Sequence, residues 1–270
     1  MTILYEDNHL IIVNKSCGEI VQSDTTGDVP LEQTVKDYLK KKYDRPGEVF
    51  LGVVHRVDRP VSGIVVFART TKAQLRLNRM LQEKLIRKTY WAVVKELPPE
   101  ETGTLIHYIT RNTKTNRSYA HTNECRGSKK AVLHYRHIAS SDHYHLLEID
   151  LETGRHHQIR CQLAAIGCPI RGDLKYGYPR SNPNGGISLH ARQIRFKHPV
   201  KEEEINLTAP LPDDSLWEIF ARQVPISSQS VSHSLSYRPK GNTETYSLPS
   251  TDWLAMGAFS NLSCNWTRPQ

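Results

Sequence analysis

The 270-residue sequence has no apolar run near the ~20 residues that a membrane-spanning helix requires. Its start, which includes Glu6 and Asp7, lacks the apolar segment of a signal peptide, so we expect a cytoplasmic protein with no membrane association. The five cysteines show neither zinc-site spacing nor the density of a disulfide scaffold, and we interpret them as reduced thiols. What remains is a soluble protein with one sizeable catalytic domain or two small ones.

Acidic residues are in the minority. The formal net charge is +8, and residues 1–226 contain 33 Lys and Arg against 26 Asp and Glu. Many basic proteins are merely soluble, but a surplus of this size makes nucleic acid the first candidate partner. Residues 227–270 contain ten serines, few charges and no periodic apolar stripe. We therefore predict a catalytic domain at 1–226 and a disordered extension at 227–270.

A loop rich in charged residues separates two apolar, β-branched runs at 49–54 and 64–68, which are typical of buried strands. Pro60 fixes one backbone torsion of this loop, and Gly63 can adopt a positive φ. The loop is thus shaped by its own sequence, and it presents Asp58 at the end of a strand.

Arg56 and Arg59 flank Asp58, and nearby cations favour the carboxylate form. Two interpretations fit this pattern. Asp58 acts as a nucleophile, base or charge stabiliser, or it is a structural ion pair that ties the loop together. The spacing alone does not separate them.

Elsewhere the periodicity predicts a hairpin from residues 3–5 and 10–13, and helices at 31–43 and from Thr70 or Thr71 to about Leu85.

The loop segment His55-Arg56-Val57-Asp58-Arg59-Pro60-Val61-Ser62-Gly63 resembles the catalytic motif of the RluA family of pseudouridine synthases, which carries that family's essential aspartate. Further matches to the family lie before this segment at 4–7 and 13–15, and after it at 151–163, 169–173, 176–177, 189–191 and 196–199. Together they cover about residues 3–220. Because the first match begins so early, we expect a minimal enzyme without the S4 RNA-binding domain that several members carry ahead of it.

The resemblance implies three catalytic residues. Asp58 is the essential aspartate, and Arg160 of the Gln-Ile-Arg triplet pairs with it. Tyr90, in the segment Lys88-Thr89-Tyr90 before an apolar strand, packs on the target uracil and serves in proton removal. A tyrosine at a strand start is more often simple core packing, so the role of Tyr90 depends on the resemblance.

The third signature is predicted to begin a helix capped by Thr153, with Ile159 and Leu163 on its buried face. The neighbouring His156 and His157 invite a metal interpretation. We expect no metal, because adjacent side chains diverge and no carboxylate follows at ligand spacing. His156 also departs from the family, which usually has a small hydroxyl residue there.

Residues 103–137 read as strands and are strongly basic, with tyrosines interleaved. Such a run is usually a solvated face, but cations and aromatics alternating on strands suit contacts with phosphates and unstacked bases. Lys129 and Lys130 are predicted to lie in an outward-reaching turn with Gly127. The substrate-binding residues that we expect are Arg56, His55, Arg59, Arg155, Lys129 and Lys130.

The fold implied is α/β (α+β), with a central mixed, largely antiparallel sheet and flanking helices. The activity implied is isomerisation of uridine to pseudouridine in structured rRNA or tRNA by a monomeric, cofactor-free enzyme that flips the target base. Arg56 fills the vacated stack. Asp58 attacks the sugar, attacks the base or removes a ribose proton, and the sequence leaves these open. The alternatives are a non-catalytic RNA-binding protein on the same scaffold, and a hydrolase that uses Asp58.

Overall fold

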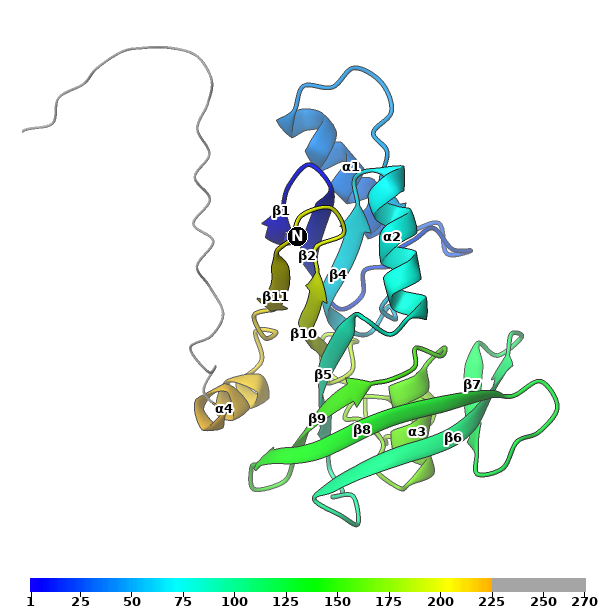
Figure 1. Ribbon diagram of the computed structural model, residues 1–270. Coiled ribbons are helices and arrows are strands. Elements are labelled where there is room, and N and C mark those ends of the chain that lie inside the picture. Colours follow the sequence, from blue (N-terminus) through cyan, green and yellow to red (C-terminus); the bar gives the residue numbers. More distant parts are fainter. Residues whose placement is uncertain (225–270) are drawn as a thin grey trace, which may run out of the picture. The chain divides into compact units, whose positions relative to one another are not determined.

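The computed structural model describes residues 1–224 (Figure 1). The predicted extension at 227–270 therefore lies outside the described residues. Within the described part, no helix is long and apolar enough to cross a membrane.

One mixed sheet forms the centre of the molecule. Its main path runs in the order β1-β2-β4-β10-β5-β9-β8-β6-β7. These strands are β1 (Thr2–Glu6), β2 (Leu10–Lys15), β4 (Ser62–Ala68), β10 (Leu189–Lys197), β5 (Arg87–Val94), β9 (His145–Leu151), β8 (Lys129–Ser140), β6 (Thr102–Asn112) and β7 (Arg117–His121). Two shorter strands, β3 (Gly52–Val53) and β11 (Glu204–Thr208), pair with β4 and β10.

Only β4 and β10 pair in parallel among the described strands, and the other pairs are antiparallel. The parallel pair joins two segments that lie more than a hundred residues apart in the sequence. The expected α/β fold with a mixed, largely antiparallel sheet is confirmed.

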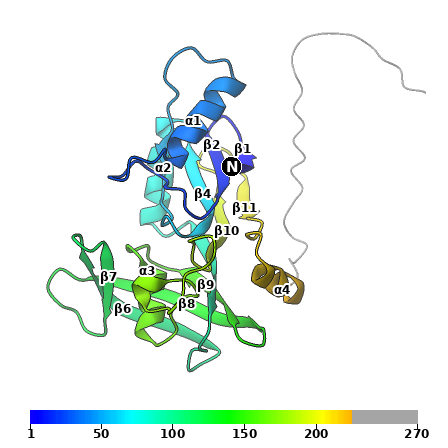
Figure 2. The same ribbon diagram turned by 180° about the vertical axis from the view of Figure 1, so that it is seen from behind.

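Helices cover both faces of the sheet. Ile11 and Val13 of β2 pack in the same cluster as α1 (Leu31–Lys42) and α3 (Gln158–Ala165), while Leu10 and Ile12 pack with α2 (Thr71–Gln82). Successive residues of a strand point to opposite faces, so this alternation follows from the β2 sequence. Helix α4 (Ser215–Gln223) packs in a third cluster on strands β5, β8 and β9. Figure 2 shows α1 and α3 on the near side of the sheet.

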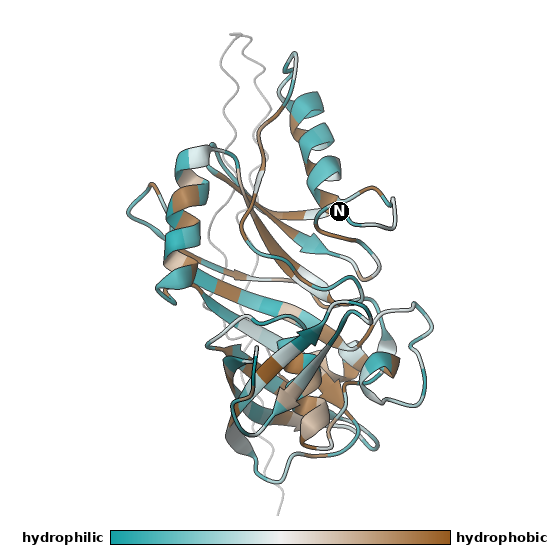
Figure 3. Cartoon of the chain, turned by 90° about the vertical axis from the view of Figure 1, so that its right-hand side faces the viewer, coloured by the Kyte–Doolittle hydropathy of each residue, from teal (hydrophilic) through white to brown (hydrophobic). Residues whose placement is uncertain are grey.

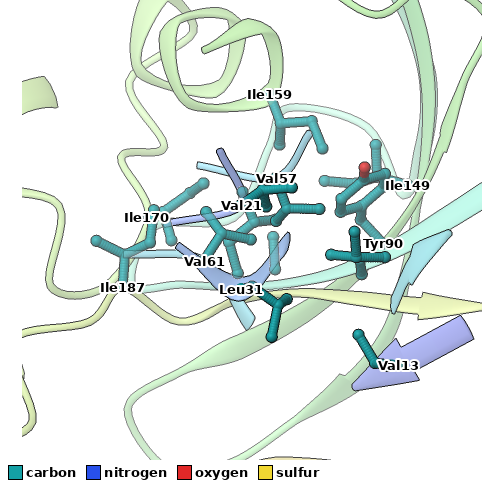
Figure 4. Packing of buried hydrophobic residues seen from close by; sticks show 14 of the residues in the cluster. Val13, Val21, Leu31, Val57, Val61, Tyr90, Ile149, Ile159, Ile170 and Ile187 are labelled. Atoms are coloured by element: carbon teal, nitrogen blue, oxygen red, sulfur yellow. The ribbon is translucent and has the colours of Figure 1, made fainter. Parts of the chain in front are cut away.

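The hydropathy colours of Figure 3 show apolar residues concentrated on the central strands and on the inner sides of the helices. Figure 4 shows the cluster on the α1 and α3 face, where Val57 and Val61 lie among buried side chains that include Tyr90 and Ile159. Because Val57 and Val61 come from the loop between β3 and β4, this core anchors that loop.

Several predicted elements are confirmed. β1 and β2 form the expected hairpin, α1 follows its predicted span, and Thr70 caps α2 by accepting a hydrogen bond from the Ala73 N–H at 3.2 Å. Two predicted boundaries were wrong, namely the end of α2 and the extent of the strand at 49–54. α2 ends at Gln82, where the positive φ of Lys84 breaks the helix and leaves Leu85 56% exposed.

The run at 49–54 forms a strand only over β3, because Phe50 is 46% exposed and does not join the core.

Candidate active site

The loop between β3 and β4 is held at several points. The carbonyl of Arg59 accepts a hydrogen bond from the Gly18 N–H at 2.8 Å, and the carbonyl of Pro60 accepts one from the Ile187 N–H at 2.9 Å. Gly63 has a φ of +113°, and a Cβ there would collide with the backbone of Ala191 on β10. The predicted positive φ is therefore confirmed, and the close pairing of β4 and β10 requires it.

Asp58 and Arg160 meet across the site. Nη1 of Arg160 donates to Oδ2 of Asp58 at 3.1 Å, which gives the pairing that the resemblance implied. The other edge of the guanidinium donates to Asp173, from Nε at 2.7 Å and from Nη2 at 2.9 Å. Burial alone would lower the pKa of Arg160, but the hydrogen bonds and charges of Asp173 and Asp58 raise it above its ordinary value. Arg160 is thus a fixed cation between two carboxylates.

Asp173 was not among the predicted site residues. It lies 1% exposed beside the short 3₁₀ helix Leu174–Tyr176 and orients Arg160 from behind. The sequence offered one signal for it, since 169–173 matches a family motif. Nothing in that motif states which side chain Asp173 contacts.

The two adjacent histidines stack instead of diverging. Their ring centroids lie 3.8 Å apart with an angle of 21° between the planes, because His157 takes a left-handed conformation with φ 52° and ψ 27°. The prediction of divergence was therefore wrong. His157, and not Thr153, is the N-cap residue of α3, and Thr153 instead donates from Oγ1 to Oε1 of Gln158 at 2.8 Å.

Tyr90 is 8% exposed on β5 and lines the same cleft as Asp58. Burial, and after it the negative charge of Asp58, raises the pKa of its hydroxyl. The phenol therefore stays protonated near neutral pH.

Lys15 is a second buried cation near the loop that sequence reasoning missed. Its side chain is 1% exposed, and Nζ donates to the carbonyls of Ser16 at 2.9 Å and Arg59 at 3.1 Å. Burial lowers the pKa of Lys15 to about 8. Lys15 therefore holds the loop backbone next to Asp58 through its hydrogen bond to the carbonyl of Arg59.

A cleft of about 850 Å³ opens over these residues. Seven of the predicted residues line it, namely His55, Arg56, Asp58, Arg59, Tyr90, Arg155 and Arg160. Arg111, His156, His157 and Lys175 line it as well. Cations therefore surround Asp58 in the cleft, and Asp24 is the other carboxylate that lines it.

The predicted binding residues differ in whether other side chains or backbone groups already contact them. Arg59 forms an ion pair with Asp28 at 2.6 Å, whereas Arg56 is exposed and has no ion pair within residues 1–224. Nε2 of His55 accepts the Val66 N–H at 3.2 Å, and burial, then the charge of Lys88, lowers the pKa of His55 to about 3.

Lys129 and Lys130 do not line the cleft. They are exposed at the start of β8, paired with β6, so their predicted place in the Gly127 turn was wrong. Residues 125–128 form that turn, and β8 begins directly after it. The carbonyl of Lys130 accepts a hydrogen bond from Nε of Arg155 at 3.1 Å, which ties this strand end to a cleft residue.

Asp7, His198 and Glu203 are the one group of candidate metal ligands found among the described residues, away from the cleft. Their ligand atoms lie within 4.8 Å of one another. The ammonium of Lys201 already lies among them, 2.8 Å from Oδ2 of Asp7 and 3.3 Å from Oε1 of Glu203. Nδ1 of His198 accepts two backbone N–H groups, so the ring proton lies on Nε2 and blocks that lone pair. We therefore assign no metal to this group.

Comparisons with known proteins show the family to which this chain belongs. A family model described as RNA pseudouridylate synthase matches residues 9–165. The chain belongs to the RluA family of RNA pseudouridine synthases. It is 34% identical over 220 residues to a protein of Bacillus subtilis (strain 168) named "Uncharacterized RNA pseudouridine synthase YhcT", covering 79% of this chain and 70% of that protein.

A second relative of this RNA pseudouridine synthase is the ribosomal large subunit pseudouridine synthase D of Vibrio cholerae, which is 33% identical over 228 residues, covering 79% of this chain and 68% of that protein. Among solved structures, human RNA pseudouridylate synthase domain containing 4 superposes with a TM-score of 0.67 at 24% identity, over 82% of this chain and 92% of that one. This likeness shows the shared fold. The chain is therefore an isomerase that acts on uridine in RNA.

Proposed function

We propose that this enzyme isomerises one or a few specific uridines in structured rRNA or tRNA, and that Asp58 carries the chemistry. The observation that supports this proposal most directly is the ion pair between Asp58 and Arg160 in a basic cleft that Tyr90 also lines. A carboxylate in this place suits a reaction in which positive character develops on the ribose.

The reaction conserves atoms and electrons, so it needs no redox partner. The bond from N1 of uracil to C1′ of the ribose breaks, the detached uracil rotates, and C5 bonds to the same C1′. The hydrogen on C5 is lost, and N1 gains one. The role of Asp58 is to stabilise or trap the sugar or the base while the two are apart, and Arg160 holds the Asp58 carboxylate in place through their ion pair.

A base inside folded RNA must leave its stack to reach this cleft. Arg56 is suited to fill the vacated place, because its planar guanidinium can stack on bases and bind phosphate, and it has no ion pair within residues 1–224. We assign Tyr90 to packing on the flipped uracil. Because its hydroxyl has a raised pKa, we favour the packing role over proton removal by a phenolate.

The remaining predicted contacts fall into two groups. His55, Arg59 and Arg155 line the cleft and are proposed to contact nucleotides next to the target. Lys129 and Lys130 lie outside it and would contact phosphates farther along the RNA, on the exposed end of β8.

The deciding experiment maps pseudouridine in total RNA from cells with and without the gene, and complements the deletion with wild type, Asp58→Asn or Asp37→Asn. Asp37 is an exposed carboxylate on α1 and serves as the matched control. Wild type and Asp37→Asn are expected to restore the same sites, and Asp58→Asn none. Purified Asp58→Asn should bind the substrate RNA within about tenfold of wild type, because phosphate contacts dominate affinity.

A non-catalytic RNA-binding protein is the alternative that this experiment tests. It would leave every pseudouridine unchanged in the deletion while the protein still bound RNA. Full activity of Asp58→Asn would instead remove Asp58 from the mechanism.

A further inference from the structure

His157 lies next to Asp58 in an unusual conformation. It is the N-cap residue of α3, its backbone is left-handed at φ 52°, and the residue is 8% exposed. Nε2 of His157 lies 3.6 Å from Oδ2 of Asp58, and Nδ1 lies 2.8 Å from the hydroxyl oxygen of Tyr176. A left-handed backbone is unfavourable in conformational free energy for most residues other than glycine. The fold therefore places this ring at some cost in stability.

The hydrogen bonds around Tyr176 fix which nitrogen of His157 carries a proton. The hydroxyl oxygen of Tyr176 accepts the Ser118 N–H at 2.8 Å, so its own proton is free to be donated. Within residues 1–224, Nδ1 of His157 is the acceptor in reach of that proton. Nδ1 is therefore unprotonated, and the proton of a neutral imidazole lies on Nε2.

The surroundings keep both rings in these states. Burial, followed by the charge of Arg160, lowers the pKa of His157 to about 2, so the imidazole is neutral near neutral pH. Burial also raises the pKa of Tyr176 to about 12, so its phenol keeps the proton that it donates.

The two oxygens of Asp58 are consequently not equivalent. Oδ2 faces Nη1 of Arg160 at 3.1 Å and Nε2 of His157 at 3.6 Å. Oδ1 accepts no hydrogen bond from the described residues. A distance of 3.6 Å is too long for a hydrogen bond in the free enzyme, but catalytic contacts of this kind commonly shorten when substrate closes a site.

We propose that His157 is a positioning residue for Asp58: as a neutral Nε2–H donor whose tautomer is set by Ser118 and Tyr176, it holds Oδ2 together with Arg160 and leaves Oδ1 as the oxygen that acts on the substrate. This inference rests on the proposed role of Asp58. It assigns to His157 a role that acts through Asp58. A neutral donor fits this place better than a second cation, because it orients the carboxylate without adding charge beside Arg160.

The competing explanation is packing alone, since the ring also stacks on His156 and meets Tyr176 edge-on at 5.6 Å. Two substitutions separate the explanations. His157→Asn tolerates a left-handed backbone but is too short to place a donor at the Nε2 position. His157→Gln reaches that position, and its amide can accept from Tyr176 while it donates to Asp58.

The experiment measures steady-state kcat and KM, RNA affinity and unfolding for both variants, with Asp58→Asn in parallel. His157→Asn is expected to lower kcat on the order of 10- to 100-fold with RNA affinity unchanged. His157→Gln should recover most of that loss. Wild-type kcat in His157→Asn, or an equal loss in both folded variants, would overturn the proposal.

Tyr176→Phe tests the tautomer of His157 by a measurement other than kinetics. The ring that lies over the guanidinium of Arg160 at 5.0 Å is kept, and only the hydroxyl is removed. Nitrogen-15 NMR of the His157 ring is expected to show protonated Nε2 and bare Nδ1 in wild type, and a mixture of the two tautomers in Tyr176→Phe. A proton on Nδ1 in wild type would contradict the inference.

The parallel Asp58→Asn measurement keeps the two proposals distinct. If Asp58→Asn is inactive while His157→Asn is fully active, only the role of His157 is lost. If Asp58→Asn is active, the proposed function of Asp58 is wrong, whatever the His157 variants do.

Discussion

Arg160 donates two hydrogen bonds to Asp173, at 2.7 and 2.9 Å, and this leaves Nη1 directed at Asp58. The cation of the site is therefore oriented by a carboxylate that is 1% exposed and does not line the cleft. A two-point contact fixes both the position and the rotation of a planar guanidinium. Asp173 consequently helps to aim Asp58 through Arg160.

Asp173→Asn is expected to destabilise the protein by about 3–5 kcal/mol, because it leaves the buried guanidinium with one fewer anionic partner. Activity should fall further than the folded fraction does, since Arg160 loses its orientation. Urea unfolding and kcat, measured under conditions where the variant is folded, test both effects. Arg195→Gln is the control, because its pair with Glu204 is exposed. Unchanged stability of Asp173→Asn would contradict the buried-pair argument.

Arg56 and Arg59 flank Asp58 but differ in their partners. Arg56→Ala is expected to lower kcat/KM by about tenfold or more, because a free guanidinium that stacks and binds phosphate is lost. Arg59→Ala should cost much less, since Arg59 is already paired with Asp28 at 2.6 Å. Release of tritium from RNA labelled at C5 of uridine measures the rate. Equal losses in the two variants would show that the ion pair of Arg59 opens when RNA binds.

Local chemistry accounts for the parts of the fold that the sequence predicted. Thr70 caps α2 as its type and position suggest, and Gly63 takes the positive φ that its place in the loop implied. The spacing of Leu31, Val35 and Leu39 predicted the buried face of α1. For Thr70 and for the buried face of α1, the deciding interactions lie within a few residues of sequence, whereas the positive φ of Gly63 also serves its close pairing with Ala191 on β10.

Tertiary contacts decided the rest of the site. His157 and Asp173 could not be assigned from the sequence, because the left-handed turn of one and the contact of the other depend on Tyr176 and Arg160 in the fold. Lys129 was placed in a turn because Gly127 lies nearby, but pairing with β6 extends β8 over it. Asp58, Tyr90 and Arg160 were predicted by resemblance, since the sequence pattern alone left Asp58 and Tyr90 with a structural explanation.

Tyr90 offers a test of what the uracil packs against. Tyr90→Leu is expected to lower kcat by more than about 100-fold, because the aromatic face for the flipped base is lost. Tyr90→Phe should retain a clearly larger share of activity, since the ring is kept. Affinity for RNA, measured separately, should change little in either variant because phosphates dominate it. Equal inactivity of the two variants would show that the hydroxyl, and not the ring, carries the function.

Stability should fall in acid because buried histidines resist protonation. Burial, followed by the charge of Arg192, lowers the pKa of His190 to about 3, and burial lowers that of His157 to about 2. Between those values and the ordinary pKa of about 6.5, the unfolded chain binds protons that the native protein does not. The free energy of unfolding therefore decreases as pH drops below about 6.5, by up to about 1.4 kcal/mol per pH unit for each such histidine.

His190→Asn removes one of these titrations and keeps a polar group beside Ser62, whose hydroxyl lies 2.8 Å from Nδ1 of His190. Urea unfolding between about pH 7 and about pH 4.5 should show a slope against pH that is shallower than in wild type, by a difference that grows to about 1.4 kcal/mol per pH unit at the acid end. His143→Gln, at an exposed position, should keep the wild-type slope. His190 is fully buried, and its Nε2 has no hydrogen-bond partner within residues 1–224. A slope unchanged in His190→Asn would mean that His190 of the native protein binds a proton as readily as the unfolded chain does, so that burial does not lower its pKa.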